Sequence, residues 1–140
     1  RADNKSMLVL LDDAGKIASY ADVPDIALDL IEVADKPTTI IYPGAKRLAP
    51  NLIAEDGTIG IRITREEFTR SLIFRYNKPI VSTSANISGE PSPHFFGEIS
   101  EEIKNAVDYI VDYRRNDHKP AAPSSIIKLG MGGEIQIIRK

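Results

Sequence analysis

The run Met7–Leu11 (MLVLL) is the feature that most constrains the fold, because five consecutive apolar residues are typical of a strand buried on both faces. Apolar side chains at helical spacing follow in Ile26–Ala34, behind Pro24 and Asp25, which can start a helix. Strand and helix therefore alternate from the beginning. This order favours a sheet with helices packed on it.

Hydrophobic patterning and turn residues predict the other elements. Thr64-Arg65-Glu66-Glu67 has the sequence of a capping box, so we expect a helix from there to about Tyr76, ended by Asn77-Lys78-Pro79. Further strands are predicted at Thr38–Tyr42, Thr58–Ile63, Pro79–Ser82, Tyr109–Val111, Ser125–Leu129 and Glu134–Ile138, and a further helix at Glu98–Val107.

Seven strands and three helices in mixed order predict an α/β (α+β) fold with a mixed sheet. The helical connection from Met7 to Thr38 has the pattern of a parallel crossover, whereas the last two strands form an antiparallel hairpin across Gly130–Gly133.

Composition excludes several classes of protein. A chain of 140 residues, 42% hydrophobic and 27% charged, is expected to form one globular domain. It has no Cys, which excludes disulfides, thiolate catalysis and Cys-ligated zinc, and His94 and His118 are poor material for a metal site. The formal net charge of −2 argues against nucleic-acid binding by global electrostatics. No apolar run is long enough to span a bilayer and no signal peptide is evident, so we expect a cytoplasmic protein without membrane contact.

A small, polar loop follows the strand predicted at Pro79–Ser82. Residues 82–93 (STSANISGEPSP) contain five hydroxyls, one carboxamide and one Gly. Hydroxyls and free N–H groups in a turn suit phosphate or carboxylate oxygens. The same residues are also typical of a surface loop in which Ser, Asn and Gly only make turns, and composition alone favours that second interpretation.

The segment Thr58–Ile63 alternates between two faces of a strand. Thr58, Gly60 and Arg62 share one face, and three Ile residues share the other, which packs. An Arg on the sheet surface can clamp a carboxylate with two hydrogen bonds. It can equally reach solvent from an edge position, so the residues alone leave both interpretations open.

Five fragments in chain order resemble the YrdC-like family, the L-threonylcarbamoyladenylate synthases of tRNA modification. The most specific is the Ser-Ala-Asn loop with its trailing Gly and Ser-Pro. The fragments are Arg1–Leu11 (an Arg, then Asn-Lys before an apolar strand), Gly57–Arg62, Pro79–Asn86 with Ser88-Gly89 and Pro91-Ser92-Pro93, Pro123–Ile127, and Ile137–Arg139. The resemblance therefore extends through the whole chain.

This resemblance implies a twisted mixed sheet with a concave, positively charged surface. It also implies an enzyme, a nucleotidyltransferase that converts L-threonine, bicarbonate or CO₂, and ATP into threonylcarbamoyl-AMP and pyrophosphate, with Mg²⁺ accompanying ATP. Downstream transferase machinery would pass the threonylcarbamoyl group to N6 of adenosine 37 in tRNA. Members of the family also bind tRNA or double-stranded RNA.

The resemblance further implies which residues contact each substrate. By position, Arg1, Lys5, Thr58, Ser84, Asn86, Ser92 and Arg139 resemble the ATP contacts, and Arg62, Ser82 and Ser124 resemble the threonine contacts. No Ser has a plausible His-Asp relay, so we expect the serines to bind substrate and no residue to act as a covalent nucleophile.

Two departures from the family pattern bear on these expectations. The family's Pro-Gly before the third strand is replaced by Asp35-Lys36-Pro37, although the following Thr is present. The family's opening Pro-Thr-Asp-Thr-Val-Tyr-Gly-Leu segment is absent, so we expect a single domain over residues 1–140 that is truncated at its N-terminus, and whether it is active alone stays open. The alternative function is a non-catalytic RNA-binding or regulatory module of the same fold.

Overall fold

The computed structural model describes residues 7–140, which fall into two compact units. The sheet unit comprises residues 7–82 and 124–140, and the loop unit, in its described part, comprises residues 83–123. The predicted ATP contacts Arg1 and Lys5 lie outside the described residues.

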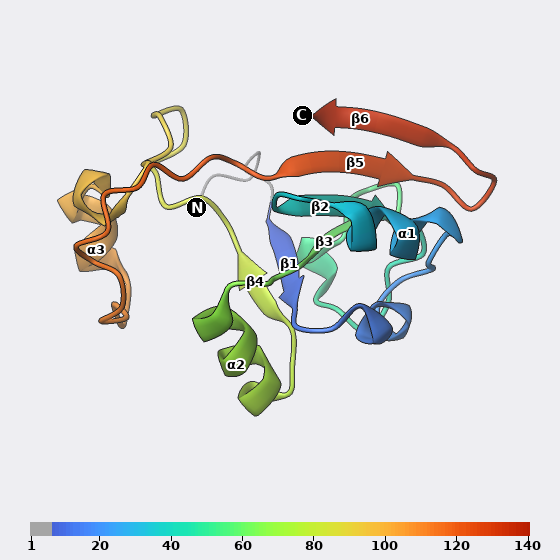
Figure 1. The fold of residues 1–140 in the computed structure, drawn as a ribbon, viewed down its shortest axis with the longest axis horizontal. Coiled ribbons are helices and arrows are strands. Elements are labelled where there is room, and N and C mark those ends of the chain that lie inside the picture. The colour runs from blue at the N-terminus through green and yellow to red at the C-terminus, as the bar shows by residue number, and fades with distance from the viewer. Residues whose placement is uncertain (1–6) are drawn as a thin grey trace. The chain divides into compact units, whose positions relative to one another are not determined.

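Six strands form one mixed sheet in the sheet unit, in the order β4-β1-β3-β2-β5-β6 (Figure 1). The strands are β1 (Leu8–Leu11), β2 (Thr38–Tyr42), β3 (Ile59–Ile63), β4 (Ile80–Ser82), β5 (Ser125–Leu129) and β6 (Ile135–Arg139). The same unit contains α1 (Ile26–Val33), α2 (Glu67–Tyr76) and the short 3₁₀ segments η1 (Ala14–Ser19) and η2 (Pro50–Leu52). The predicted mixed sheet with helices is confirmed.

Strand directions correct one prediction about the connection from Met7 to Thr38. β1 pairs with β3 in parallel, and β2 pairs with β3 antiparallel. β1 and β2 are therefore not neighbours and run in opposite directions, so the expected parallel crossover is wrong. A helical connection does not itself fix the direction of return, and here β3 occupies the position between the two strands. The antiparallel hairpin of β5 and β6 is confirmed.

The start of α2 differs from the predicted capping box. The Glu66 side chain caps the helix by accepting hydrogen bonds from two backbone N–H groups of the first turn, at 3.0 and 2.9 Å. The hydroxyl of Thr64 instead accepts from the N–H of Glu66, at 3.3 Å. The helix thus begins two residues later than a Thr64 cap would place it. Asn77 ends it as predicted, in the left-handed region with φ 60°, and donates to the carbonyl of Ile73.

The loop unit contains little regular structure. The helix predicted at Glu98–Val107 is shorter, since α3 covers Glu101–Ala106 with Ser100 as its cap, and a 3₁₀ segment, η3 (Phe96–Glu98), precedes it. The strand predicted at Tyr109–Val111 is wrong. That segment pairs with no strand among the described residues, and Tyr109 is 77% exposed. The described residues therefore contain six strands rather than seven.

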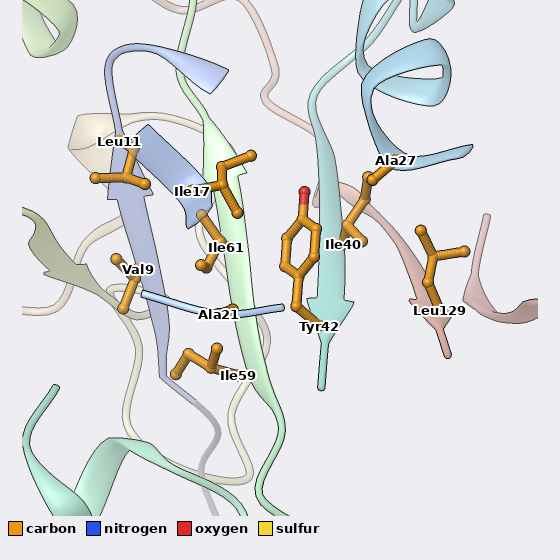
Figure 2. Packing of buried hydrophobic residues seen from close by; sticks show 10 residues of the cluster. All are labelled: Val9, Leu11, Ile17, Ala21, Ala27, Ile40, Tyr42, Ile59, Ile61 and Leu129. Atoms are coloured by element: carbon orange, nitrogen blue, oxygen red, sulfur yellow. The ribbon is translucent and has the colours of Figure 1, made fainter. Parts of the chain in front are cut away.

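The hydrophobic core covers one face of the sheet. The register aligns Val9 of β1, Ile61 of β3 and Ile40 of β2, all nearly inaccessible to solvent. Ile17 from η1 and Ala27 from α1 pack onto this row, as Figure 2 shows. Because side chains alternate along a strand, the residues between these positions lie on the opposite face, where the polar side chains gather.

Among residues 7–140, no helix has both the length and the apolar composition needed to cross a membrane.

Candidate functional site

One row of residues crosses the face of the sheet that lies opposite the core. Leu10 of β1 pairs with Arg62 of β3, which pairs with Thr39 of β2. The row continues through Ile126 of β5 to Arg139 of β6. We call these five positions the polar row. Two predicted contacts, Arg62 and Arg139, therefore lie on the same face.

A β-bulge puts Arg139 on this face. Ile126 pairs with Arg139 and Ile127 pairs with Ile137, so Ile138 is an extra residue in β6. Without it, strict alternation would place Ile138 opposite Ile126 and turn Arg139 toward the core face. Bulges commonly redirect a side chain in this way next to binding sites.

Ser124 joins the polar row just before β5. Its hydroxyl lies 2.8 Å from the hydroxyl of Thr39, and its carbonyl accepts a hydrogen bond from Nε of Arg139, also at 2.8 Å. Both hydroxyl-bearing residues are buried. These contacts connect Ser124 to β2 through its side chain and to β6 through its backbone carbonyl. Both its side chain and its backbone are therefore held in place.

The two guanidinium groups of the polar row form no ion pair with a carboxylate of the described residues, 7–140. Burial lowers the pKa of Arg62, and the positive charge of Arg139 lowers it further, which means that the two groups are near enough to repel each other. No carboxylate among residues 7–140 forms an ion pair with Arg62. A half-buried guanidinium without a counter-ion is costly, and a bound anion would relieve that cost.

Arg62 also contributes to a pocket of about 330 Å³ at the end of β3, within the size range of small-molecule sites. Ile31, Pro37 and Ile63 supply apolar surface. Arg65 closes one side by donating to the carbonyls of Ile31 in the last turn of α1 and of Ala34, its C-cap, which also satisfies groups that a helix end leaves unpaired. The lining also includes the cationic residues Lys36, Arg62 and Arg65 and the carboxylates of Asp35 and Glu66.

The other predicted contacts of the sheet unit share the same face. Ser82 of β4 pairs with Leu8 of β1, one row along from Leu10, and so points to the polar side. Thr58 precedes β3 and is buried, and its hydroxyl donates to Asp56 at 2.6 Å. Since an ionised carboxylate can only accept, the Thr58 hydroxyl is left as an acceptor toward any ligand.

The predicted contacts of the loop unit are exposed or serve the loop itself. Ser84 and Ser92 are exposed. Nδ2 of Asn86 donates to the carbonyls of Ile87 and Glu90, at 3.1 and 2.8 Å, which closes the turn. The interpretation of this segment as a turn-forming loop is therefore correct for Asn86. A ligand role for the three residues stays a prediction.

Sequence reasoning missed three residues of this face. The sequence patterns assign Thr39 only to a strand and Asp56 only to a turn. Asp56 also accepts from Lys128 at 2.7 Å, and this hydrogen bond, followed by those from Thr58, lowers its pKa to about 2. The signal for Thr39 was present, because it alternates with the core residues Ile40 and Tyr42. No local pattern could indicate the role of Lys128, since its partner Asp56 lies 72 residues away in the chain.

No group of three or more His, Cys, Asp or Glu side chains within residues 7–140 could hold a metal ion.

The fold and this face define an α/β domain with two guanidinium groups on one face of its mixed sheet. The profile of the Sua5/YciO/YrdC family, whose description is "Telomere recombination", matches residues 1–140. The chain therefore belongs to the Sua5/YciO/YrdC family.

Curated relatives share a name that describes an activity. A Methanocaldococcus jannaschii protein, provisionally named threonylcarbamoyl-AMP synthase, is 38% identical over 130 residues, which are 92% of this chain and 59% of that protein. A Pseudoalteromonas translucida protein named threonylcarbamoyl-AMP synthase is 27% identical over 139 residues, covering 96% of this chain and 73% of that protein. The chain thus spans little more than half the length of the first relative.

Solved structures share the fold. E. coli YciO superposes with a TM-score of 0.81 at 21% identity, over 99% of this chain and 67% of that one. P. abyssi Sua5 complexed with L-threonine superposes with a TM-score of 0.75 at 24% identity, over 92% of this chain and 38% of that one. These likenesses confirm the YrdC-like mixed sheet that the sequence predicts.

Proposed function

We propose that this chain carries the substrate site of an L-threonylcarbamoyladenylate synthase. The observation that carries the proposal is the pair of guanidiniums, Arg62 and Arg139, on one face of the sheet, where no carboxylate of residues 7–140 forms an ion pair with Arg62. The reaction brings together a carboxylate-bearing amino acid and the phosphates of ATP, so a site that places two guanidinium groups on one face suits it. The names of the curated relatives support the same activity.

On the threonine side, Arg62, Ser124 and Ser82 are the proposed contacts. Arg62 supplies a planar pair of N–H groups for the α-carboxylate, and Ser124 supplies a buried hydroxyl beside it. The complex of P. abyssi Sua5 with L-threonine supports threonine as the substrate class. Ser82 lies on the same face, one row away.

On the nucleotide side, the proposed contacts are Arg1, Lys5, Thr58, Ser84, Asn86, Ser92 and Arg139. The carbamate oxygen of N-carboxythreonine attacks the α-phosphorus of ATP, and pyrophosphate leaves. An anion must approach an anion, so cations and oriented donors lower the barrier by stabilising the charge that develops. Mg²⁺ enters with ATP as part of the substrate and supplies further positive charge on the phosphates.

Binding and orientation account for the whole contribution of the protein to this reaction. The chemistry is a nucleotidyl transfer without a covalent enzyme intermediate, which fits a site made of hydroxyls and guanidiniums. We also propose that the product serves the modification of tRNA in the cytosol, where ATP, bicarbonate and tRNA are all present.

The test is the release of pyrophosphate from ATP by the full gene product, with L-threonine and bicarbonate each included or omitted. We expect release only when both are present. Arg62→Ala should raise the KM for threonine about 10- to 100-fold, because a charge-assisted hydrogen bond contributes about 1.5–3 kcal/mol. The KM for ATP should change less. Arg70→Ala, which removes an exposed guanidinium of α2, is the matched control and should leave both constants unchanged.

Pyrophosphate release that ignores threonine would contradict the proposed substrate. An equal rise in the KM for threonine and in the KM for ATP in Arg62→Ala would contradict the assignment of Arg62 to the threonine side.

A further inference from the structure

A pair of buried hydroxyls lies between the two guanidiniums. Thr39 is 2% exposed and Ser124 is 4% exposed, and their oxygens are 2.8 Å apart. Thr39 occupies the middle of the sheet, paired with Arg62 on one side and with Ile126 on the other, so strands on both sides fix its backbone. Its hydroxyl is therefore a rigid reference point for Ser124.

Counting protons fixes what this pair needs. Two hydroxyls carry two protons, and the hydrogen bond between them uses one. Arg62 and Arg139 can only donate, so neither guanidinium can accept the second proton, whereas a bound carboxylate can. If Thr39 donates to Ser124, the free proton belongs to the Ser124 hydroxyl. The backbone carbonyl of Ser124 also accepts a hydrogen bond from Nε of Arg139. A group with acceptors only, such as a carboxylate, then satisfies Ser124 and a guanidinium together.

We propose that Thr39 is a positioning residue of the threonine site, which orients the Ser124 hydroxyl toward the carboxylate of the amino acid substrate. This proposal rests on the proposed function and adds the residue that aligns the donor. Thr39 does not touch the substrate and acts only through Ser124. A serine with a free rotor would have to be ordered at binding, whereas a serine held by Thr39 is ordered in advance.

The test is a double-mutant cycle in the full gene product, with Thr39→Val, Ser124→Ala and the two combined. Affinity for L-threonine is measured by calorimetry, and the KM for threonine and for ATP by pyrophosphate release. Thr39→Val should weaken the affinity for threonine about fivefold, the equivalent of about 1 kcal/mol for one hydrogen bond. The KM for ATP should change by less than about twofold. In the Ser124→Ala background the same substitution should have no further effect.

Two controls separate orientation from general damage. Thr39→Ser keeps the hydroxyl and should restore threonine affinity to within about twofold of the natural protein. Ser125→Ala removes a neighbouring buried hydroxyl of β5 that faces the other side of the sheet, and should leave threonine binding unchanged. Thermal unfolding of each variant reports whether the fold persists, and if Thr39→Val unfolds, the cycle is run with Thr39→Ala, which also removes the hydroxyl.

Each outcome decides one question. Natural protein that neither binds threonine nor uses it would overturn the proposed function itself. If the natural protein is active and Thr39→Val binds threonine with unaltered affinity, only the proposed role of Thr39 is overturned. Additive losses in the double variant, or equal losses for threonine and ATP, would assign Thr39 to the packing of the sheet and overturn the proposal.

Discussion

Ile61 and Ile137 occupy the same row of the core face but differ in burial, so they offer a matched test of where the stability of the sheet unit resides. The row runs Ile61–Ile40–Ile127–Ile137 through the registers of β3, β2, β5 and β6. Ile61 is 1% exposed and Ile137 is 61% exposed. Replacing each by Ala removes the same atoms from different surroundings.

The expected costs follow from these exposures. Ile61→Ala removes a fully buried side chain and leaves a cavity between β1 and β2, for a loss in the free energy of unfolding of about 3–4 kcal/mol. Ile137 buries only about two-fifths of its surface and leaves no closed cavity, so its loss should be about 1 kcal/mol. In urea, with a slope of about 2 kcal/mol/M, the midpoints should fall by about 1.5–2 M and about 0.5 M.

The assay is equilibrium unfolding of this 140-residue chain in urea, followed by circular dichroism. An equal shift of both midpoints would refute the reasoning, because it would mean that β6 is covered as fully as the centre of the sheet.

Two further predictions concern local interactions. Glu66→Ala should lower the free energy of unfolding by about 1 kcal/mol, measured by thermal unfolding, because it removes the cap of α2. If only Thr64→Ala lowers the stability, Thr64 is the cap, as the capping-box sequence predicts. The Asp56–Lys128 pair should contribute below about 1 kcal/mol, since the Asp56 side chain is 50% exposed. Because the folded pKa of Asp56, about 2, lies below its ordinary value of 3.8, this contribution is present above about pH 4 and lost as the pH falls toward 2. The difference in urea midpoint between the natural chain and Lys128→Met should therefore shrink from pH 7 to pH 2.5, and a constant difference would contradict it.

Local patterns in the sequence predict most strands correctly. The apolar run at Met7–Leu11 and the alternation at Thr58–Ile63 are properties of the strand itself, and both strands lie where they were expected. Tyr109–Val111 has a similar composition and forms no strand, because a strand also needs a partner that supplies hydrogen bonds, which no local pattern encodes.

The candidate site was predictable only in part. Alternation placed Arg62 on the polar face, and the structure confirms it. The position of Arg139 depends on the bulge at Ile138, and the Thr39–Ser124 contact joins residues 85 apart in the chain. Both depend on the pairing of distant strands, so a sequence read by itself could not reveal them.

The most direct test of the central claim is the identity of the product. The full gene product is incubated with ATP, L-threonine and ¹³C-labelled bicarbonate, and the nucleotide fraction is examined by mass spectrometry. The proposed function predicts threonylcarbamoyl-AMP that carries the label, formed together with an equal amount of pyrophosphate and abolished when threonine is omitted. AMP that contains neither threonine nor the label, or unchanged ATP under conditions in which threonine binds, would contradict it.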